Sequence, residues 1–205
     1  MTSTQSAFAS SARAVPPPPA ARPNRPSELV RALERMQPGE LETAFLRGAT
    51  PTADQLAGWE FRGLNTPAWF RLLGIKKFIK GFYRDAERDL WGYNCPVEQN
   101  RIVEPWIAKP SDADPKRFGF YRVTSVDPTG RDNRYLHALL LDYGQGKNPR
   151  LDPSAGLRDY LVQVDKGNPD VFLGKAYFAV GPARLPTFSF FILERHRPGP
   201  ASIER

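Results

Sequence analysis

The sequence predicts a mainly β fold, an antiparallel barrel of about six to eight strands preceded by short helices. From residue 59 onward, apolar runs of about 8–12 residues are separated by turns rich in Gly, Pro, Asn and Asp. The chain has no βαβ spacing and no GxGxxG motif, so a parallel dinucleotide-binding sheet is not expected. The apolar stretch "FSFFIL" would be an aggregation-prone edge in an open sheet, and closure into a barrel removes that edge.

The first segment, residues 1–26, is expected to be a disordered tail rich in Pro, Ala and Ser. Its four consecutive prolines, Pro16 to Pro19, favour an extended polyproline II conformation. A docking segment for a proline-recognition domain is the alternative. A chain of 205 residues has room for one domain plus tails, so residues 27–205 are expected to form a single barrel domain.

Short helices are expected within residues 27–56. In "SELVRALERM", Ser27 is available as an N-cap, and the apolar residues Leu29, Val30 and Leu33 share one face. "PGELETAFLRG" starts with Pro38 and ends at Gly48, which is the usual asymmetry of a short helix. "TADQLAGW" is expected to add a further turn, so these pieces should pack on a larger structure.

The strands are predicted from alternation and from the turns that bound them. The clearest alternation is in "LRDYLVQVD", at Tyr160, Val162 and Val164. The runs with strand composition are 58–65, 116–127, 134–144, 157–165, 171–181 and 187–196.

The segment 69–84 has two interpretations. Its apolar residues recur near helical spacing, which predicts a helix that plugs or flanks the barrel, covers a ligand cavity, or lies on a membrane. Two glycines weaken this helix, and "KKFIKGFYR" also alternates as a strand does. A peripheral membrane or interaction protein that uses this segment is a further hypothesis for the function. On an anionic membrane surface, the contacting cations would be Lys76, Lys77, Lys80 and Arg84.

Charge and cysteine content indicate the compartment and the partners. The formal net charge is +7, but no nucleic-acid-binding module is recognisable and the aromatic residues follow core-like periodicity, so nucleic-acid binding is not expected. A single cysteine excludes an intrachain disulfide and suits a reducing compartment. The N-terminus does not have the pattern of a secretory signal, and no apolar run approaches the ~20 residues that span a bilayer. We therefore expect a cytoplasmic protein.

The stretch "LAGWEFRGLN", which follows a helical section and opens a series of antiparallel strands, resembles the start of calycin or lipocalin-like small barrels. It is also similar in layout to small bacterial proteins with a Gly-x-Trp-x-Gly motif. Here Gly58 directly precedes Trp59, and the next glycine is Gly63, so the spacing departs from that motif. The resemblance implies a tryptophan packed at the base of the barrel and a cavity for a small apolar or amphipathic molecule.

The predicted function is non-catalytic binding of such a molecule, lipid-like or polyketide-like, inside the barrel, with Arg62 or Arg122 as a polar anchor. A Glu60–Arg62 ion pair facing solvent is the alternative for Arg62. A shift of one residue in a strand's parity would reverse which face lines the interior. The candidate lining residues are Trp59, Phe61, Phe120, Tyr135, His137, Tyr160, Tyr177 and Phe190.

A cyclase or isomerase acting in the same cavity is the second hypothesis, with His137, Tyr135 and Asp142 as acid–base candidates. Cys95 with His137 would be a nucleophile and its base, although a small buried cysteine and a packed histidine are the simpler interpretation. Two histidines and one cysteine do not make a typical zinc site, so no metal or cofactor is expected.

Overall fold

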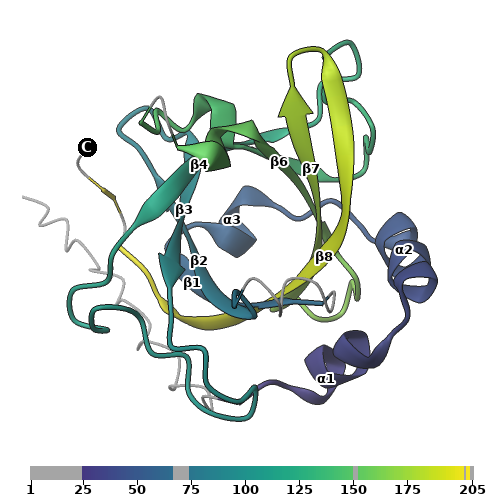
Figure 1. Cartoon of the computed structure of the whole chain (residues 1–205). Helices are drawn as coiled ribbons and strands as arrows, with labels where there is room; N and C mark the ends of the chain where they lie inside the picture. The colour runs from purple at the N-terminus through teal and green to yellow at the C-terminus, as the bar shows by residue number, and fades with distance from the viewer. Residues whose placement is uncertain (1–24, 67–73, 150–151, 201, 204–205) are drawn as a thin grey trace, which may run out of the picture.

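The computed structural model describes residues 25–66, 74–149, 152–200 and 202–203. In this part of the chain, antiparallel strands close into a barrel in which each strand pairs with its neighbours in sequence and the last pairs with the first (Figure 1). The fold class predicted from the sequence is therefore confirmed. The strands are β1 (Trp59–Asn65), β2 (Lys77–Arg84), β3 (Leu90–Pro96), β4 (Phe118–Ser125), β5 (Leu139–Asp142), β6 (Leu157–Gln163), β7 (Val171–Val180) and β8 (Ala183–Pro198).

The N-terminal helices are α1 (Glu28–Arg35), α2 (Pro38–Arg47) and α3 (Ala53–Leu56). The hydroxyl of Ser27 accepts a hydrogen bond from the backbone N–H of Val30, as expected of an N-cap. The second helix begins at Pro38 and is capped by Gly48, as predicted. Helices α1 and α2 lie outside the ring of strands, whereas α3 lies across one end of it (Figure 1). No helix of the described ranges is both long and apolar enough to span a bilayer.

The strand β2 corrects the helical interpretation of residues 69–84. Residues 77–84 alternate between the two faces of the barrel wall and pair with β1 and β3. Both faces of this strand are covered by apolar groups, so its aromatic residues lack a strict period of two and mimic helical spacing. Residues 67–73 of this segment, and residues 1–24 of the predicted tail, lie outside the described residues. The strand β3 (Leu90–Pro96) was not predicted.

Two of the four cations expected at a membrane surface are buried. The amine of Lys77 donates to the backbone carbonyls of Glu104 and Pro105, at 3.1 and 3.0 Å, and lies 3.9 Å from the ring centroid of Trp106. Lys80 is 2% exposed and points into the barrel. A contact of these two amines with lipid headgroups is therefore not possible in this fold, because their hydrogen-bonding groups are already occupied inside the protein.

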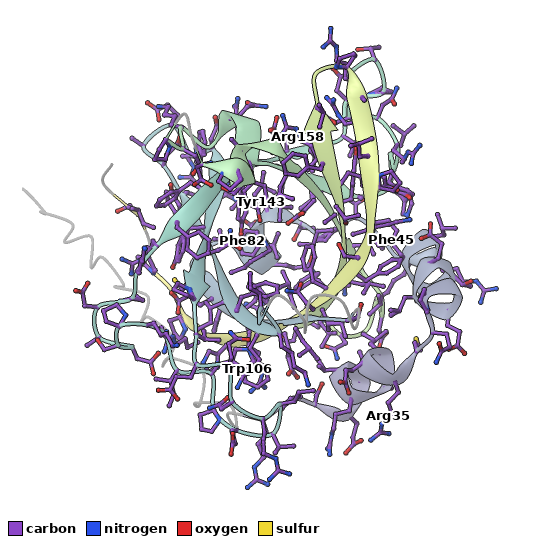
Figure 2. All side chains as sticks on the ribbon, viewed as in Figure 1. Arg35, Phe45, Phe82, Trp106, Tyr143 and Arg158 are labelled. Atoms are coloured by element: carbon purple, nitrogen blue, oxygen red, sulfur yellow. The ribbon has the colours of Figure 1, made fainter. Side chains whose placement is uncertain are left out.

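Apolar side chains cover both faces of the barrel wall. Outside, Phe45 of α2 packs against Tyr135 and Phe190, with ring centroids 5.0 and 6.4 Å apart. A second outer cluster forms around Trp106, under the chain that connects β3 and β4. Figure 2 shows Phe45 and Trp106 outside the ring of strands. The outer face thus carries large apolar clusters, as the inner face does, because the helices and this connection cover it.

Inside, the end of the barrel that α3 closes is packed with side chains. The ring of Phe61 meets Phe82 and Phe172 edge-on, each with centroids 5.5 Å apart, and Leu56 of α3 is fully buried in the same cluster. Figure 2 shows Phe82 within the ring of strands. Edge-to-face packing of this kind fills space efficiently and leaves no room for a ligand at this end.

Candidate functional site

A cavity of about 200 Å³ lies inside the barrel at the end opposite α3. The strands run so that Asn65 ends β1 and Leu157 begins β6 at this end, and both line the cavity. Ile75 and Phe118 are about half exposed at its rim, whereas the residues deeper inside are buried. The cavity is therefore a recess in one end of the barrel, with apolar residues at its mouth.

The inner wall of the recess carries a buried hydrogen-bond network centred on Lys80. Its amine donates to the side-chain carbonyl of Asn94 at 3.0 Å and forms an ion pair with Asp159, with 3.1 Å between Nζ and Oδ2. It also hydrogen-bonds the hydroxyl of Tyr143, which in turn donates to Asp159 at 3.0 Å. Asn94 donates to the carbonyl of Gly119 at 2.9 Å. These groups come from β2, β3, β6 and the turn after β5, so only barrel closure brings them together.

Aromatic rings surround the amine of Lys80. The ring centroids of Tyr121, Tyr143 and Phe191 lie 4.7, 5.0 and 5.1 Å from Nζ. Burial lowers the pKa of Lys80 below its usual value, although the neighbouring Asp159 opposes this change. Burial likewise raises the pKa of Tyr143 well above its usual value, and the charge of Asp159 adds to this effect. Tyr143 therefore keeps its proton, while Lys80 is more easily deprotonated than a lysine in water.

Glycines allow two phenylalanine rings to form the apolar walls of the recess. A Cβ atom on Gly63 would lie 2.2 Å from the ring of Phe78, and one on Gly174 would lie 2.0 Å from the ring of Phe191. The two rings face each other edge-on, with centroids 6.0 Å apart, and both line the cavity. Any larger residue at either glycine would push a ring into the recess, so the shape of the site depends on close approach of ring and backbone.

Two serines add polar groups to the wall. Ser189 is 2% exposed, and its hydroxyl hydrogen-bonds that of Thr187. The hydroxyl oxygen of Ser154 is buried without a hydrogen-bond partner among the described residues, although it lines the recess. A buried hydroxyl without a partner is unfavourable, so a polar group of a bound molecule would stabilise this position.

Of the predicted lining residues, Trp59 and Phe61 lie on the inner side of the wall, but at the packed end. The guanidinium of Arg195 lies 4.4 Å from the ring centroid of Trp59, which packs against the cluster that contains Phe61. Trp59 thus packs at the end of the barrel that α3 closes. Neither residue lines the recess, because the aromatic rings between them and the recess fill the barrel.

The other predicted lining residues lie outside the barrel wall, which corrects their assignment to its interior. Tyr135 and Tyr177 share a hydrogen bond between their hydroxyls, 2.8 Å long, in the cluster beneath α2. Arg62 pairs with Glu194 at 2.9 Å under α1, and Arg122 pairs with Asp89 on the surface. The prediction exchanged the inward and outward residues of these strands. Alternation does not distinguish the two faces here, because both are apolar. The remaining residues with outward side chains are Phe120, His137, Tyr160 and Phe190.

The three acid–base candidates are not in a cavity together. His137 lies in a turn before β5, where its Nε2 hydrogen-bonds the carbonyl of Phe45 at 3.2 Å and its ring packs against that of Phe45. Asp142 accepts from the backbone N–H of Gly144 and pairs with Arg158 at 3.1 Å. With Tyr135 in the outer cluster, the catalytic hypothesis built on these residues has no geometric support.

Cys95 is fully buried in the outer cluster around Trp106, whereas His137 belongs to the cluster beneath α2. Burial, together with the charge of Glu60, raises the pKa of the Cys95 thiol to about 12. A thiol with such a pKa is not a nucleophile near neutral pH, so a Cys95–His137 pair is excluded by both position and protonation.

The two charged residues of the recess could have been identified from the sequence. Lys80 and Asp159 are charged positions within otherwise apolar strands, and such charges must be paired when they are buried. Arg62 and Arg122, the predicted polar anchors, are likewise charged positions within strands, but they lie on the outer face. Which opposite charges meet across the barrel depends on closure, and one sequence does not contain that information.

His196 in β8, which lies outside the recess, predicts how the free energy of unfolding depends on pH. Its two ring nitrogens are buried without partners among the described residues, and burial, with the charges of Arg197 and Arg62, lowers its pKa from 6.5 to about 4, opposed by Asp112. Between these values the unfolded chain binds more protons, so the free energy of unfolding should fall by about 1–3 kcal/mol as pH drops from 6.5 to 4.

Urea denaturation at a series of pH values measures this loss, and His196→Gln is the matched variant. The variant should lose less stability over this pH range than the native protein, because it has no group to titrate at this position. An identical pH dependence in the two proteins would contradict the assignment.

Comparisons with known proteins give one similar structure and no family. No family model matches, and no curated protein matches. A solved structure described as a crystal structure of a protein from Thermomonospora curvata is similar, with 18% identity, a TM-score of 0.47, and coverage of 83% of this chain and 95% of the other. Within the described ranges, no group of three or more His, Cys, Asp or Glu residues is arranged to hold a metal ion.

Proposed function

We propose that the protein binds a small, uncharged molecule in the open end of its barrel, as a binding protein rather than as an enzyme. The observation that carries this proposal is the recess itself, in which phenylalanine walls lead to the polar network of Lys80, Tyr143 and Asp159. Ligand sites in proteins combine mostly apolar walls with a few placed polar groups in this way.

The size of the recess limits the ligand. A cavity of about 150 Å³ accommodates benzene, and drug-sized ligands occupy roughly 300 Å³ or more. The recess of about 200 Å³ therefore suits a molecule with a single ring or a short branched chain, plus one polar group. A long acyl chain or a multi-ring polyketide exceeds this volume unless most of it extends beyond the rim. This volume restricts the lipid-like ligand expected from the calycin resemblance to small molecules.

The recess carries no net charge, which favours an uncharged ligand. The amine of Lys80 and the carboxylate of Asp159 neutralise each other, and the remaining polar side chains of the inner wall are neutral. A carboxylate on the ligand would be repelled by Asp159 and would find the N–H groups of Lys80 already directed at protein acceptors. An uncharged carbonyl or hydroxyl group avoids this cost of burying a net charge.

Titration with small one-ring compounds, followed by the amide resonances of the protein in NMR spectra, tests the proposal. Benzyl alcohol and benzaldehyde are expected to shift resonances of the recess, and benzoate is not. Native mass spectrometry of the protein from its own source would detect a natural ligand of this size. Absence of any shift with every uncharged probe would contradict the proposal.

The variant Ala176→Leu is expected to abolish this binding while leaving the barrel folded. Ala176 lines the recess, and three added carbon atoms at this position occupy much of its volume. The matched control is Ala179→Leu on the same strand, whose side chain does not line the recess. The control should bind as the native protein does, and loss of binding in both variants would show that the shifts report a different site.

A further inference from the structure

We propose that the ligand is an aldehyde or a ketone, and that Lys80 forms a reversible imine with its carbonyl carbon. This proposal rests on the proposed function, because it requires the recess to be the ligand site. It goes beyond that function by assigning the chemical class of the ligand and a covalent bond to a named atom, Nζ of Lys80.

The amine is placed where a bound carbonyl would meet it. Lys80 lines the recess, and its Nζ lies between the aromatic walls and the polar groups of the inner end. Its hydrogen bonds to Asn94 and Tyr143 hold it there. A carbonyl compound in a recess of one-ring size has few positions available, so its reactive carbon is held near the amine.

The surroundings make the neutral amine, which is the nucleophilic form, easier to reach than in an exposed lysine. Burial among aromatic rings lowers the pKa of Lys80, and the only carboxylate that opposes this among the lining residues is Asp159. Desolvated lysines in apolar pockets are activated as nucleophiles for this reason. The same carboxylate remains beside the nitrogen after reaction, where it would neutralise a protonated imine.

Tyr143 and Asp159 supply the proton transfers of imine formation. The nitrogen lone pair forms a bond to the carbonyl carbon, and the carbon–oxygen π electrons move to oxygen, which takes a proton from the Tyr143 hydroxyl. The nitrogen gives a proton to Asp159, and a proton then passes from Asp159 to the Tyr143 oxygen along the hydrogen bond that joins them. The carbinolamine hydroxyl then takes a proton from Tyr143 and leaves as water, while the nitrogen lone pair forms the carbon–nitrogen double bond. The protonated imine that results passes its N–H proton through Asp159 back to Tyr143. One carbonyl compound and one amine give one imine and one water, with no oxidant or reductant.

Lys77 shows that burial alone does not make such a site, and it is the matched control within the chain. It lies in the same strand and is also fully buried, but on the outer face of the wall. Its amine is directed at backbone carbonyl oxygens of the connection between β3 and β4, and it does not line the recess. A carbonyl compound in the recess therefore meets the amine of Lys80 only.

Reductive trapping tests the proposal. The native protein is incubated at neutral pH with benzaldehyde and cyanoborohydride, and the adduct is located by peptide mass spectrometry. The expected result is one benzyl group on Lys80, formed roughly tenfold or more faster than on an exposed lysine or on Lys77, because the recess holds benzaldehyde beside the amine of Lys80. Lys77, whose pKa burial also lowers, to about 8, shows whether a lowered pKa is enough without the recess. Benzyl alcohol, which occupies the recess but forms no imine, should slow the reaction. The variant Lys80→Met should lose the fast benzylation. The location of the adduct in the native protein tests the proposal even if this variant does not fold.

The outcomes separate this proposal from the proposed function. Rapid, competed labelling of Lys80 supports both. Resonance shifts with benzaldehyde and benzyl alcohol, without preferential labelling of Lys80, would overturn the imine and leave the binding site in place. Neither shifts nor preferential labelling would overturn both.

Discussion

Replacing Asp159 with alanine is expected to lower the free energy of unfolding by about 3–5 kcal/mol. The substitution leaves the amine of Lys80, which is 2% exposed, without its charged partner inside the barrel. It also removes the acceptor of the Tyr143 hydroxyl. An uncompensated buried cation is costly because the barrel interior solvates it poorly, and part of the loss is relieved when Lys80 releases its proton.

Urea denaturation measures this loss, and Asp89→Ala is the matched control. Asp89, which precedes β3, pairs with Arg122 of β4, but its side chain is 44% exposed, so its removal should cost about 1 kcal/mol or less. The double variant Lys80→Met/Asp159→Leu should recover most of the stability, because it removes both charges together. If Asp159→Ala costs no more than Asp89→Ala, the ion pair is not buried as described.

Replacing Phe61 with alanine is expected to cost about 3–5 kcal/mol, because it leaves a cavity in the packed end of the barrel. The ring of Phe61 is fully buried and meets Phe82 and Phe172 edge-on. This end is closed by α3, so neighbouring groups have little freedom to fill the space. The measurement is again the free energy of unfolding in urea.

Phe118→Ala is the control for this second substitution. Phe118 is 41% exposed at the rim of the recess, so its loss should change stability by about 0.5 kcal/mol. Benzyl alcohol should still bind Phe61→Leu, which keeps a large apolar side chain at the packed end. Loss of binding in that variant, without loss of stability, would support the original prediction that Phe61 lines the ligand site.

The helical section shows what local sequence determines well. Ser27 caps α1 and Pro38 starts α2, as predicted, because caps and first-turn prolines act within three or four residues of the chain. The barrel was also predictable, since the turns between β4 and β8 are marked by glycine, proline and aspartate. Length of strand was less predictable: β5 covers only Leu139–Asp142, because the residues before it form a turn.

The sequence predicted the type of site, a recess inside a barrel, but not the residues that line it. A barrel with an internal recess was expected, but most residues chosen to line it lie on the outer face, where Phe45 and Trp106 cover them. Alternation reveals the inner face of a strand only when the other face is polar, and here both are apolar.

By itself, the sequence determined the strand-rich second half, the caps of the first helices and the presence of charges within apolar strands. The tertiary structure alone decided which face of each strand points inward, that one end of the barrel is packed while the other is hollow, and that Lys80 meets Asp159 across the interior. The physical reason is that secondary structure follows from interactions between near neighbours in the chain. The pairing of buried charges and the volume left between aromatic rings follow from closure, which brings residues almost 80 positions apart into contact.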